Sequence, residues 1–298
     1  MLFNCFNDMI EMTSLWKGER YEDGRPRVSD GVLERIRKLK LEEVWEPLWN
    51  KGYANQFEGE FQIIHRHKSM VGRAVTAVMV PQRPDLDSTL RTVGKENGFR
   101  GNYNQWVIDS LRDDDVAVVD LFDKVRFGTY IGGNLGTSIS ERTKRGGAVI
   151  WGGVRDSEQL SEIAEINVFC RGSDPTLLKD TMMVGFNVPT RIGQAICLPG
   201  DVVLGTPAGV VFIPPHLAEE IASDAEKIQI RDHFSFERLN SRTYTTSELD
   251  AEWSSAIWSD FYNWLEVAPV AEQYRYLDWG NEKGILTSIP ASSIFEQK

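Results

Sequence analysis

The chain has 298 residues, of which 41% are hydrophobic and 26% are charged, so it can bury a substantial core. Its 33 Lys and Arg residues against 44 Asp and Glu give a formal net charge of −11, which disfavours direct binding of nucleic acid. No segment approaches the roughly 18 consecutive apolar residues that a membrane helix needs, so we expect no membrane association.

The cysteines and the first residues indicate a compartment. Cys5, Cys170 and Cys197 are too scattered for a disulfide framework and form no CxxC pair, which favours a reducing environment. The opening residues combine acidic side chains with a short apolar stretch and lack a basic leader, which is not typical of a signal peptide. We therefore expect a cytoplasmic protein.

The N-terminal third is predicted to be an arm followed by helices. Residues 1–28 are polar, with scattered aromatic side chains, glycines and a proline, as in a segment that lies on a surface. Ser29 or Asp30 is a suitable helix N-cap. The apolar residues between Val32 and Leu48 have helical spacing, with a break expected near Lys40.

The middle of the chain alternates between predicted strands and helices, which indicates an α/β core. Strands are expected at 71–80, 115–122, 147–153 and 166–172, with helices at 104–113, 134–144 and 157–165. The strands at 115–122 and 147–153 are almost continuously apolar, so both of their faces should be buried. Short antiparallel strands are then expected within 191–215, and a helix at 216–228. The predicted core domain is 29–228.

Residues 229–298 are predicted to form a C-terminal extension. The segment is first polar and rich in Ser and Thr, and then carries aromatic residues at helical spacing, among them Trp253, Trp258 and Trp264. Such spacing is typical of packing, either on the core or on a neighbouring subunit.

The glycine-rich turn Gly132-Gly133-Asn134-Leu135-Gly136 follows a predicted strand and begins a predicted helix. Free backbone N–H groups and the positive end of the helix dipole favour a carboxylate or phosphate at such a turn. A purely steric role of the glycines is the alternative, and the turn matches neither a dinucleotide fingerprint nor a P-loop.

Arg155 and Asp156 follow the buried strand at 147–153, at the strand end where open sheets bind ligands. A guanidinium at this position can bind a carboxylate through two hydrogen bonds, and the carboxylate of Asp156 can bind Mg²⁺ or Mn²⁺ together with waters. The alternative is structural: Asp156 caps the next helix with Gln159 as its partner, and Arg155 forms a surface ion pair.

Other reactive side chains offer weaker candidates. The four histidines form no metal-binding pattern, so surface or capping roles are expected for His65, His67, His216 and His233. Cys170 lies in an apolar strand and is expected to be inert. Asp120 and Arg171, at strand ends, are second-tier candidates for lining the same site.

The string of residues 132–156, GGNLGTSISERTKRGGAVIWGGVRD, resembles the signature of the RraA-like family: a glycine-rich turn, a small-residue helix, a glycine-bounded strand and a closing Arg-Asp pair. Further segments match in order at 70–80, 108–120, 168–172 and 198–215, so the resemblance covers roughly residues 36 to 225. It implies a swivelling β/β/α core with a mixed sheet, and a homotrimer or homohexamer.

The family includes class II aldolases such as 4-hydroxy-4-methyl-2-oxoglutarate aldolase, oxaloacetate decarboxylases, a ribonuclease regulator and proteins labelled as menaquinone methyltransferases. Its aldolases carry an Asp-x20-Arg-Asp pattern, and Arg155 and Asp156 match the second half. Asn134 stands at the first position, and Thr206-Pro207-Ala208 replaces an acidic turn in the last hairpin. Both are departures from the aldolase pattern.

The resemblance implies a divalent-metal-dependent lyase of the aldolase or decarboxylase type, acting on a 2-oxo or hydroxy carboxylic acid through a metal-stabilised enolate. Arg155 and Asp156 are the expected catalytic residues, and Asp156 is the expected ligand of Mg²⁺ or Mn²⁺. The small anionic substrate is expected to contact Gly133, Asn134, Leu135, Gly136 and Arg155. The alternative is a non-catalytic regulatory protein that uses the same fold to bind a partner.

Overall fold

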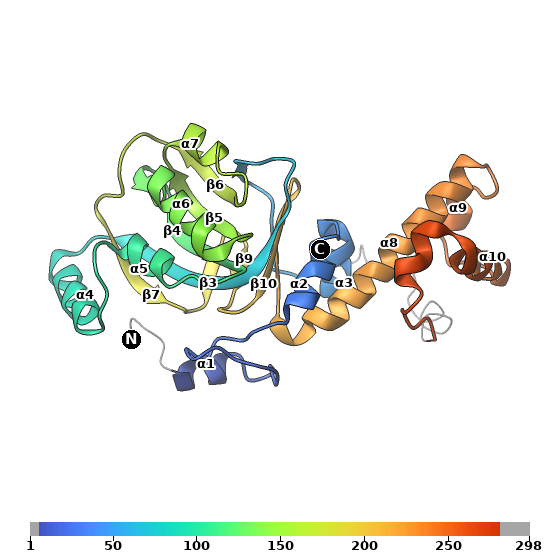
Figure 1. Ribbon diagram of the computed structural model, residues 1–298, viewed down its shortest axis with the longest axis horizontal. Helices are drawn as coiled ribbons and strands as arrows, with labels where there is room; N and C mark the ends of the chain where they lie inside the picture. Colours follow the sequence, from blue (N-terminus) through green and yellow to red (C-terminus); the bar gives the residue numbers. More distant parts are fainter. Residues whose placement is uncertain (1–5, 281–298) are drawn as a thin grey trace, which may run out of the picture. The chain divides into compact units, whose positions relative to one another are not determined.

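The computed structural model describes residues 6–280. The chain divides into two compact units, Met1–Ala222 and Ser223–Lys298. The first unit contains a mixed nine-stranded sheet with helices, and the second is helical (Figure 1). The predicted α/β class with a mixed sheet and a helical C-terminal region is confirmed.

Four parallel strands form the centre of the sheet in the order β3, β4, β5 and β6. Their bounds are Met70–Pro81 for β3, Asp115–Thr129 for β4, Gly147–Val154 for β5 and Asn167–Ser173 for β6. All four coincide with predicted strands, and β4 continues beyond the predicted end at residue 122.

Antiparallel strands flank this parallel centre. On the β3 side lie β10 (Val202–Thr206), β11 (Gly209–Ile213) and β1 (Phe57–Glu58), while β2 (Gln62–Ile63) lies beyond β6. Strand β7 (Thr181–Phe186) pairs with the second half of β3, and β8 (Thr190–Ile192) pairs with β9 (Ala195–Cys197) in a separate small sheet. The predicted antiparallel module at 191–215 therefore contains two hairpins.

The central strands are buried on both faces, which explains their continuous apolar sequences. In β4, Ala117 and Val119 belong to one hydrophobic cluster, whereas Val116 and Val118 belong to another. The first cluster includes residues of α5 (Tyr103–Asp109), α6 (Gly133–Thr143) and α7 (Ser157–Ser161), and Figure 1 shows these helices on one side of the sheet. The second cluster includes residues of β8, β9 and the β10–β11 hairpin.

The helices before the sheet follow the sequence prediction in part. Helix α2 (Asp30–Ile36) has Ser29 as its N-cap, and α3 (Leu41–Asn50) begins after Lys40, so the predicted break is confirmed. Helices α1 (Phe6–Met12) and α4 (Pro84–Glu96) were not predicted, because few of their residues are buried and the apolar period is weak. The 3-10 helix η1 (Pro215–Leu217) follows β11.

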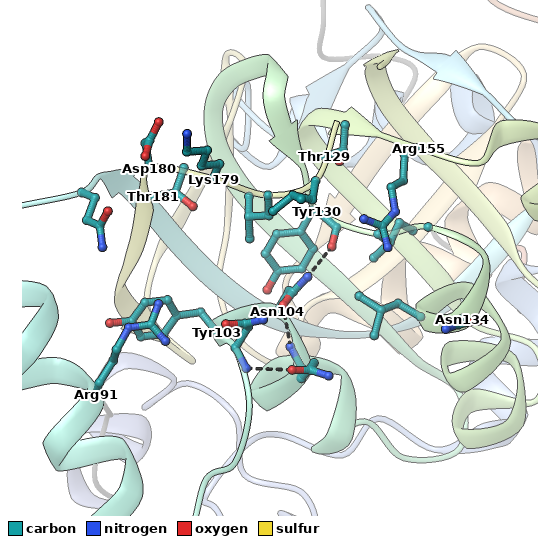
Figure 2. A pocket seen from close by; sticks show the side chains of 18 residues that line it. Arg91, Tyr103, Asn104, Thr129, Tyr130, Asn134, Arg155, Lys179, Asp180 and Thr181 are labelled. Atoms are coloured by element: carbon teal, nitrogen blue, oxygen red, sulfur yellow. Dashed lines mark hydrogen bonds between the residues drawn. The ribbon is translucent and has the colours of Figure 1, made fainter. Parts of the chain in front are cut away.

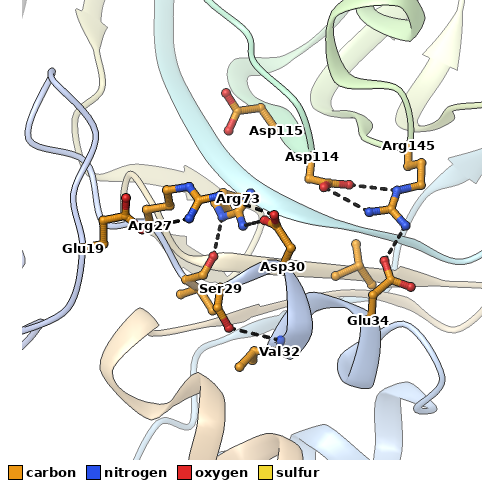
Figure 3. A network of polar contacts seen from close by, with 12 residues as sticks. Glu19, Arg27, Ser29, Asp30, Val32, Glu34, Arg73, Asp114, Asp115 and Arg145 are labelled. Atoms are coloured by element: carbon orange, nitrogen blue, oxygen red, sulfur yellow. Dashed lines mark hydrogen bonds and ion pairs between the residues drawn. The ribbon is translucent and has the colours of Figure 1, made fainter.

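The N-terminal arm packs within the first unit through charged contacts. The guanidinium of Arg25 binds both carboxylate oxygens of Asp115, at 2.7 and 2.9 Å, and the two side chains are buried. Further along, Asp30 pairs with the buried Arg73, as Figure 3 shows. The same figure shows a neighbouring ion pair outside the arm, between Arg145 and Asp114. The arm is thus anchored on the sheet by ion pairs, with its first five residues outside the described part.

The second unit has its own aromatic core. Helix α8 (Ala218–Asn240) begins in the first unit and is longer than predicted, and α9 (Thr246–Leu249), α10 (Ser255–Val267) and the 3-10 helix η2 (Pro269–Tyr274) follow. Phe234, Trp253 and Phe261 are buried against one another in this core. Packing of the extension on the core domain or on a neighbouring subunit stays a prediction. Residues 281–298 of the predicted extension lie outside the described residues. Within residues 6–280, no helix has the length and apolarity needed to cross a membrane.

Candidate functional site

The ends of the parallel strands β4 and β5 bring the glycine-rich turn and the Arg-Asp pair together. Beyond the regular strands, the amide of Tyr130 donates to the carbonyl of Gly153 at 2.8 Å, and the amide of Arg155 donates to the carbonyl of Ile131 at 2.9 Å. Two segments separated by about twenty residues in the sequence are thereby held side by side at one edge of the sheet. This is the edge at which ligands bind in open α/β sheets.

Asp156 contacts the glycine-rich turn and does not cap its own helix with its side chain. Its backbone is left-handed, with φ of 53°, and its carbonyl accepts the amide of Leu160 at the start of α7. Its Oδ2 atom instead lies 3.2 Å from the amide nitrogen of Gly133 and 3.2 Å from Nε of Arg155. The capping alternative, with Gln159 as reciprocal partner, is therefore wrong for the side chain.

The glycines of the turn lie close to side chains of α7 and of the loop that precedes it. A Cβ atom on Gly132 would lie 2.6 Å from Nε of Arg155 and would clash with the carboxylate of Asp156. A Cβ atom on Gly133 would overlap the side-chain amide of Gln159. The steric alternative thus applies to both glycines, and the same closeness places a carboxylate at the positive end of α6.

The amides of the turn differ in their availability to a ligand. The amide of Gly133 already donates to Asp156, and that of Gly136 donates to the carbonyl of Gly132 at 2.9 Å within the helix. Gly136 therefore has a steric role, because its Cα faces Leu160 too closely for a side chain. The amides of Asn134 and Leu135 lie in the first turn, where a helix supplies no acceptor.

A cavity of about 390 Å³ lies beside the turn. Gly132, Asn134, Leu135 and Arg155 line one side of it, and Figure 2 shows Arg155 and Asn134 on this side. Asp156 lines a neighbouring open cavity of about 410 Å³, which shares Arg155 with the first. Arg155 is therefore the residue that connects the two cavities.

The opposite side of the 390 Å³ cavity is lined by residues that the sequence analysis missed. Figure 2 shows Arg91 and Tyr103 there, with Lys179 above them. The guanidinium of Arg91 lies 4.6 Å from the ring centre of Tyr103, and its Nε lies 3.0 Å from a carboxylate oxygen of Asp87. Lys179 makes no ion pair among residues 6–280. With Arg155, three cationic side chains and one carboxylate, Asp180, line the cavity, a balance that favours an anion.

Asn104 holds the residue that follows β4, between the two sides of the 390 Å³ cavity. Its side-chain amide donates to the carbonyl of Tyr130 at 2.7 Å. The hydroxyl of Tyr130 is buried and has no hydrogen-bond partner in the described part of the chain, and burial raises the pKa of this phenol. Tyr130 therefore stays protonated at neutral pH and can donate a hydrogen bond. No motif in the sequence indicated this residue.

The second-tier candidates do not line the cavity. Burial raises the pKa of Asp120, and its carboxylate accepts the amide of Phe122 at 2.8 Å. Arg171 stacks on Trp151 and binds Asp123 at 2.8 Å. Burial raises the pKa of the Cys170 thiol to about 11, in agreement with an inert cysteine.

The donor set at Asp156 fits a hydrated divalent ion. Among residues 6–280 there is no cluster of three or more His, Cys, Asp or Glu side chains around a common point, so a site built from protein ligands alone is absent there. Mg²⁺ needs only one or two carboxylates when waters and substrate oxygens fill its shell. Asp156 is 38% exposed and uses one oxygen, Oδ2, for protein contacts, so the second oxygen can bind such an ion.

The fold and this edge of the sheet define an α/β protein with a cavity lined by Arg91, Arg155 and Lys179 next to the carboxylate of Asp156. Over residues 27–212 the sequence matches the family model RraA-like, described as Aldolase/RraA. The chain therefore belongs to the RraA-like family, and the predicted resemblance is confirmed.

Two comparisons with sequences and solved structures support this assignment. A Halalkalibacterium halodurans protein named "Putative 4-hydroxy-4-methyl-2-oxoglutarate aldolase" is 30% identical over 118 residues, which cover 40% of this chain and only 55% of that protein. The fold is shared with Streptomyces coelicolor RraAS2, an unusual member of the RNase ES inhibitor RraA protein family. That match has a TM-score of 0.58 and 20% identity, and covers 70% of this chain and 98% of the other.

A third match is an uncharacterized protein from Pseudomonas syringae pv. tomato, with a TM-score of 0.64 and 18% identity over 79% of this chain and 99% of the other. Identities at this level establish the fold alone. The family contains both aldolases and regulators of ribonucleases, so the chemistry of this chain has to be argued from its own site.

Proposed function

We propose that this protein is a divalent-metal-dependent lyase of the class II aldolase or decarboxylase type, acting on a 2-oxo or hydroxy carboxylic acid. The observation that carries the proposal is the position of the Asp156 carboxylate, 3.2 Å from the amide of Gly133 and 3.2 Å from the guanidinium of Arg155. A carboxylate that capped α7 would contact the first turn of that helix instead.

Arg155 binds the substrate carboxylate in this proposal. Its Nε holds Asp156, and no residue in the described range 6–280 accepts a hydrogen bond from its two terminal nitrogens. Those nitrogens form a planar fork that matches a carboxylate. The amides of Asn134 and Leu135 add donors that need no reorganisation during the reaction.

Asp156 would hold Mg²⁺ or Mn²⁺ through Oδ1, the carboxylate oxygen that makes no hydrogen bond within the described residues. When bound, the ion supplies Lewis-acid stabilisation of negative charge on the substrate oxygens. Lys179 and Arg91 line the far side of the neighbouring cavity and favour a substrate that is anionic there as well. The whole arrangement orients one acidic substrate between two positively charged ends.

A non-catalytic regulatory protein is the second candidate, and one observation favours it. Asn134 stands where the aldolases of the family carry an aspartate, and an amide side chain neither accepts a proton nor neutralises a cation. Retention of Asp156 favours the enzyme.

Calorimetry with oxalate, which has the planar two-oxygen arrangement of an enolised 2-oxo acid, separates the two candidates. We expect oxalate to bind only in the presence of Mg²⁺ or Mn²⁺, and the variant Arg155→Lys to bind it at least about tenfold more weakly, because lysine cannot form the paired hydrogen bonds. The matched control is Arg142→Lys, which changes an exposed ion pair on α6 and should leave binding unchanged. Absence of oxalate binding with either ion would favour the regulator.

We further expect a homotrimer or homohexamer, as the family resemblance implies. The aromatic residues of the second unit do not add to this expectation, because they are buried in their own core. Light scattering at micromolar concentration measures the mass directly, relative to 33.8 kDa for one chain. A monomer under these conditions would contradict the expectation.

A further inference from the structure

A second cavity, of about 350 Å³, lies in the first unit and shares no lining residue with the site described above. One wall is the segment that follows α1, from Met12 to Trp16. The other wall is formed around β9 and the end of β11, with Ile196, Leu198 and Pro214 as apolar members. A cavity of this size with mostly apolar walls is typical of small-molecule sites.

A buried carboxyl group lines this cavity. Asp201 is 2% exposed and closes the turn Leu198-Pro199-Gly200-Asp201 ahead of β10. Its Oδ2 accepts the amide of Leu198 at 2.8 Å, but its Oδ1 has no hydrogen-bond partner among residues 6–280. Buried carboxyl oxygens are nearly always paired, because an unpaired one loses its hydration without compensation.

No Lys or Arg side chain lines the cavity beside Asp201. Burial raises the pKa of its carboxyl to about 8, so the group holds a proton at neutral pH. The other ionisable groups of the cavity are Tyr53 and His216, whose hydroxyl and Nε2 lie 3.2 Å apart. Burial lowers the pKa of His216, so this imidazole is neutral at pH 7. Cys197, which neighbours Asp201, is a buried thiol whose pKa is raised by burial.

Gln56 is another polar side chain of the lining, and its amide nitrogen is already hydrogen-bonded. Gln56 donates from Nε2 to the carbonyls of Ile196 and Phe212, at 3.2 and 2.9 Å. Among the side chains that line the cavity, Asp201 is therefore the one carboxyl, and its Oδ1 is a buried oxygen without a hydrogen-bond partner in the described residues. A ligand with a positively charged donor would give this oxygen both a hydrogen-bond partner and a counter-charge.

We propose that this cavity binds a small amphipathic amine, whose apolar ring or branched chain packs on the Ile196 and Leu198 wall while its ammonium group pairs with Asp201. The two walls provide the apolar contact area, and Asp201 provides the specificity for a cation. This proposal is independent of the lyase chemistry, because the two sites have no residue in common.

The proposed pairing of an ammonium group with Asp201 predicts that binding releases protons. A cation next to a carboxyl favours its ionised form and lowers its pKa. Since Asp201 is mostly protonated at pH 7 in the free protein, amine binding should release close to one proton to the solvent. A neutral ligand of the same shape should release none.

The experiment is calorimetry of the full chain at pH 7 with 2-phenylethylamine, repeated in phosphate and MOPS buffers, which differ in their enthalpy of ionisation, so that the difference in binding enthalpy gives the number of protons released. The neutral comparator is 2-phenylethanol. We expect the amine to bind about 10- to 100-fold more tightly than the alcohol, as a charged hydrogen bond to a buried group allows. We expect proton release with the amine only.

Two variants locate the effect. Asp201→Asn keeps an acceptor for the Leu198 amide but cannot ionise, so it should abolish proton release and remove the preference for the amine. Ile196→Trp fills the cavity from a residue that is 42% exposed and should weaken both ligands without disturbing the core. Thermal melting reports whether each variant is folded. The proposal is overturned if the amine does not bind at millimolar concentration, binds without proton release, or binds Asp201→Asn as well as the original chain.

Discussion

Asp156→Ser is expected to lower metal-dependent turnover of a 2-oxo acid by about 100- to 1000-fold, the range typical of losing one charge contact in a transition state. The substitution removes the carboxylate that lies between the amide of Gly133 and the guanidinium of Arg155. The side chain of Asp156 makes no cap hydrogen bond to α7, so the loss would not come from a lost cap of that helix. The measurement is pyruvate release from a panel of 2-oxo and hydroxy acids, with Mg²⁺ or Mn²⁺ present.

The matched control is Glu158→Ser, which removes a carboxylate that lines the same open cavity two residues further along the chain. It should leave turnover within a few-fold of the original, because an exposed side chain away from the glycine-rich turn makes no transition-state contact. Near-normal turnover in Asp156→Ser, with a folded protein, would mean that the site assignment is wrong. Equal losses in both variants would indicate a general effect of charge on the cavity.

The central sheet could be predicted because its strands are buried on both faces. Residues such as Val118 and Val119 point to different hydrophobic clusters, so their sequence is apolar without interruption. Strand β7 (Thr181–Phe186) was missed because a six-residue apolar run can be a strand or part of a helix, and only its pairing with β3 decides between the two. Strands β1 and β2 have two residues each and leave no periodic signal.

The candidate site could also be predicted in part, from the positions at which the strands end. Parallel neighbouring strands end at the same edge, so residues that follow β4 and β5 were expected to meet. The sequence does not reveal that the amide of Gly133 is occupied by Asp156, since that contact depends on the left-handed backbone at residue 156. Arg91 and Lys179 enter the cavity from segments without a motif. Only the three-dimensional arrangement assigns them to the site.

Asp115→Ala is expected to lower the free energy of unfolding of the first unit by about 3–5 kcal/mol, the usual cost of removing one partner from a buried ion pair. The side chains of Arg25 and Asp115 are 1% and 0% exposed, and the pair is held by two hydrogen bonds of 2.7 and 2.9 Å. Without Asp115, the guanidinium keeps the carbonyl of Ala74, at 3.2 Å, and a longer ion pair with the half-exposed Asp23, at 3.7 Å. Urea unfolding measures the change.

The control for this prediction is Glu19→Ala, which removes the exposed partner of Arg27 at 2.9 Å and should cost less than about 1 kcal/mol. The double variant Arg25→Met with Asp115→Leu removes both charges and keeps apolar volume, so it should recover part of the loss. This recovery distinguishes an uncompensated charge from a packing defect, because a defect would grow with a second substitution. A loss in Asp115→Ala no larger than in Glu19→Ala would contradict the buried ion pair as the anchor of the N-terminal arm.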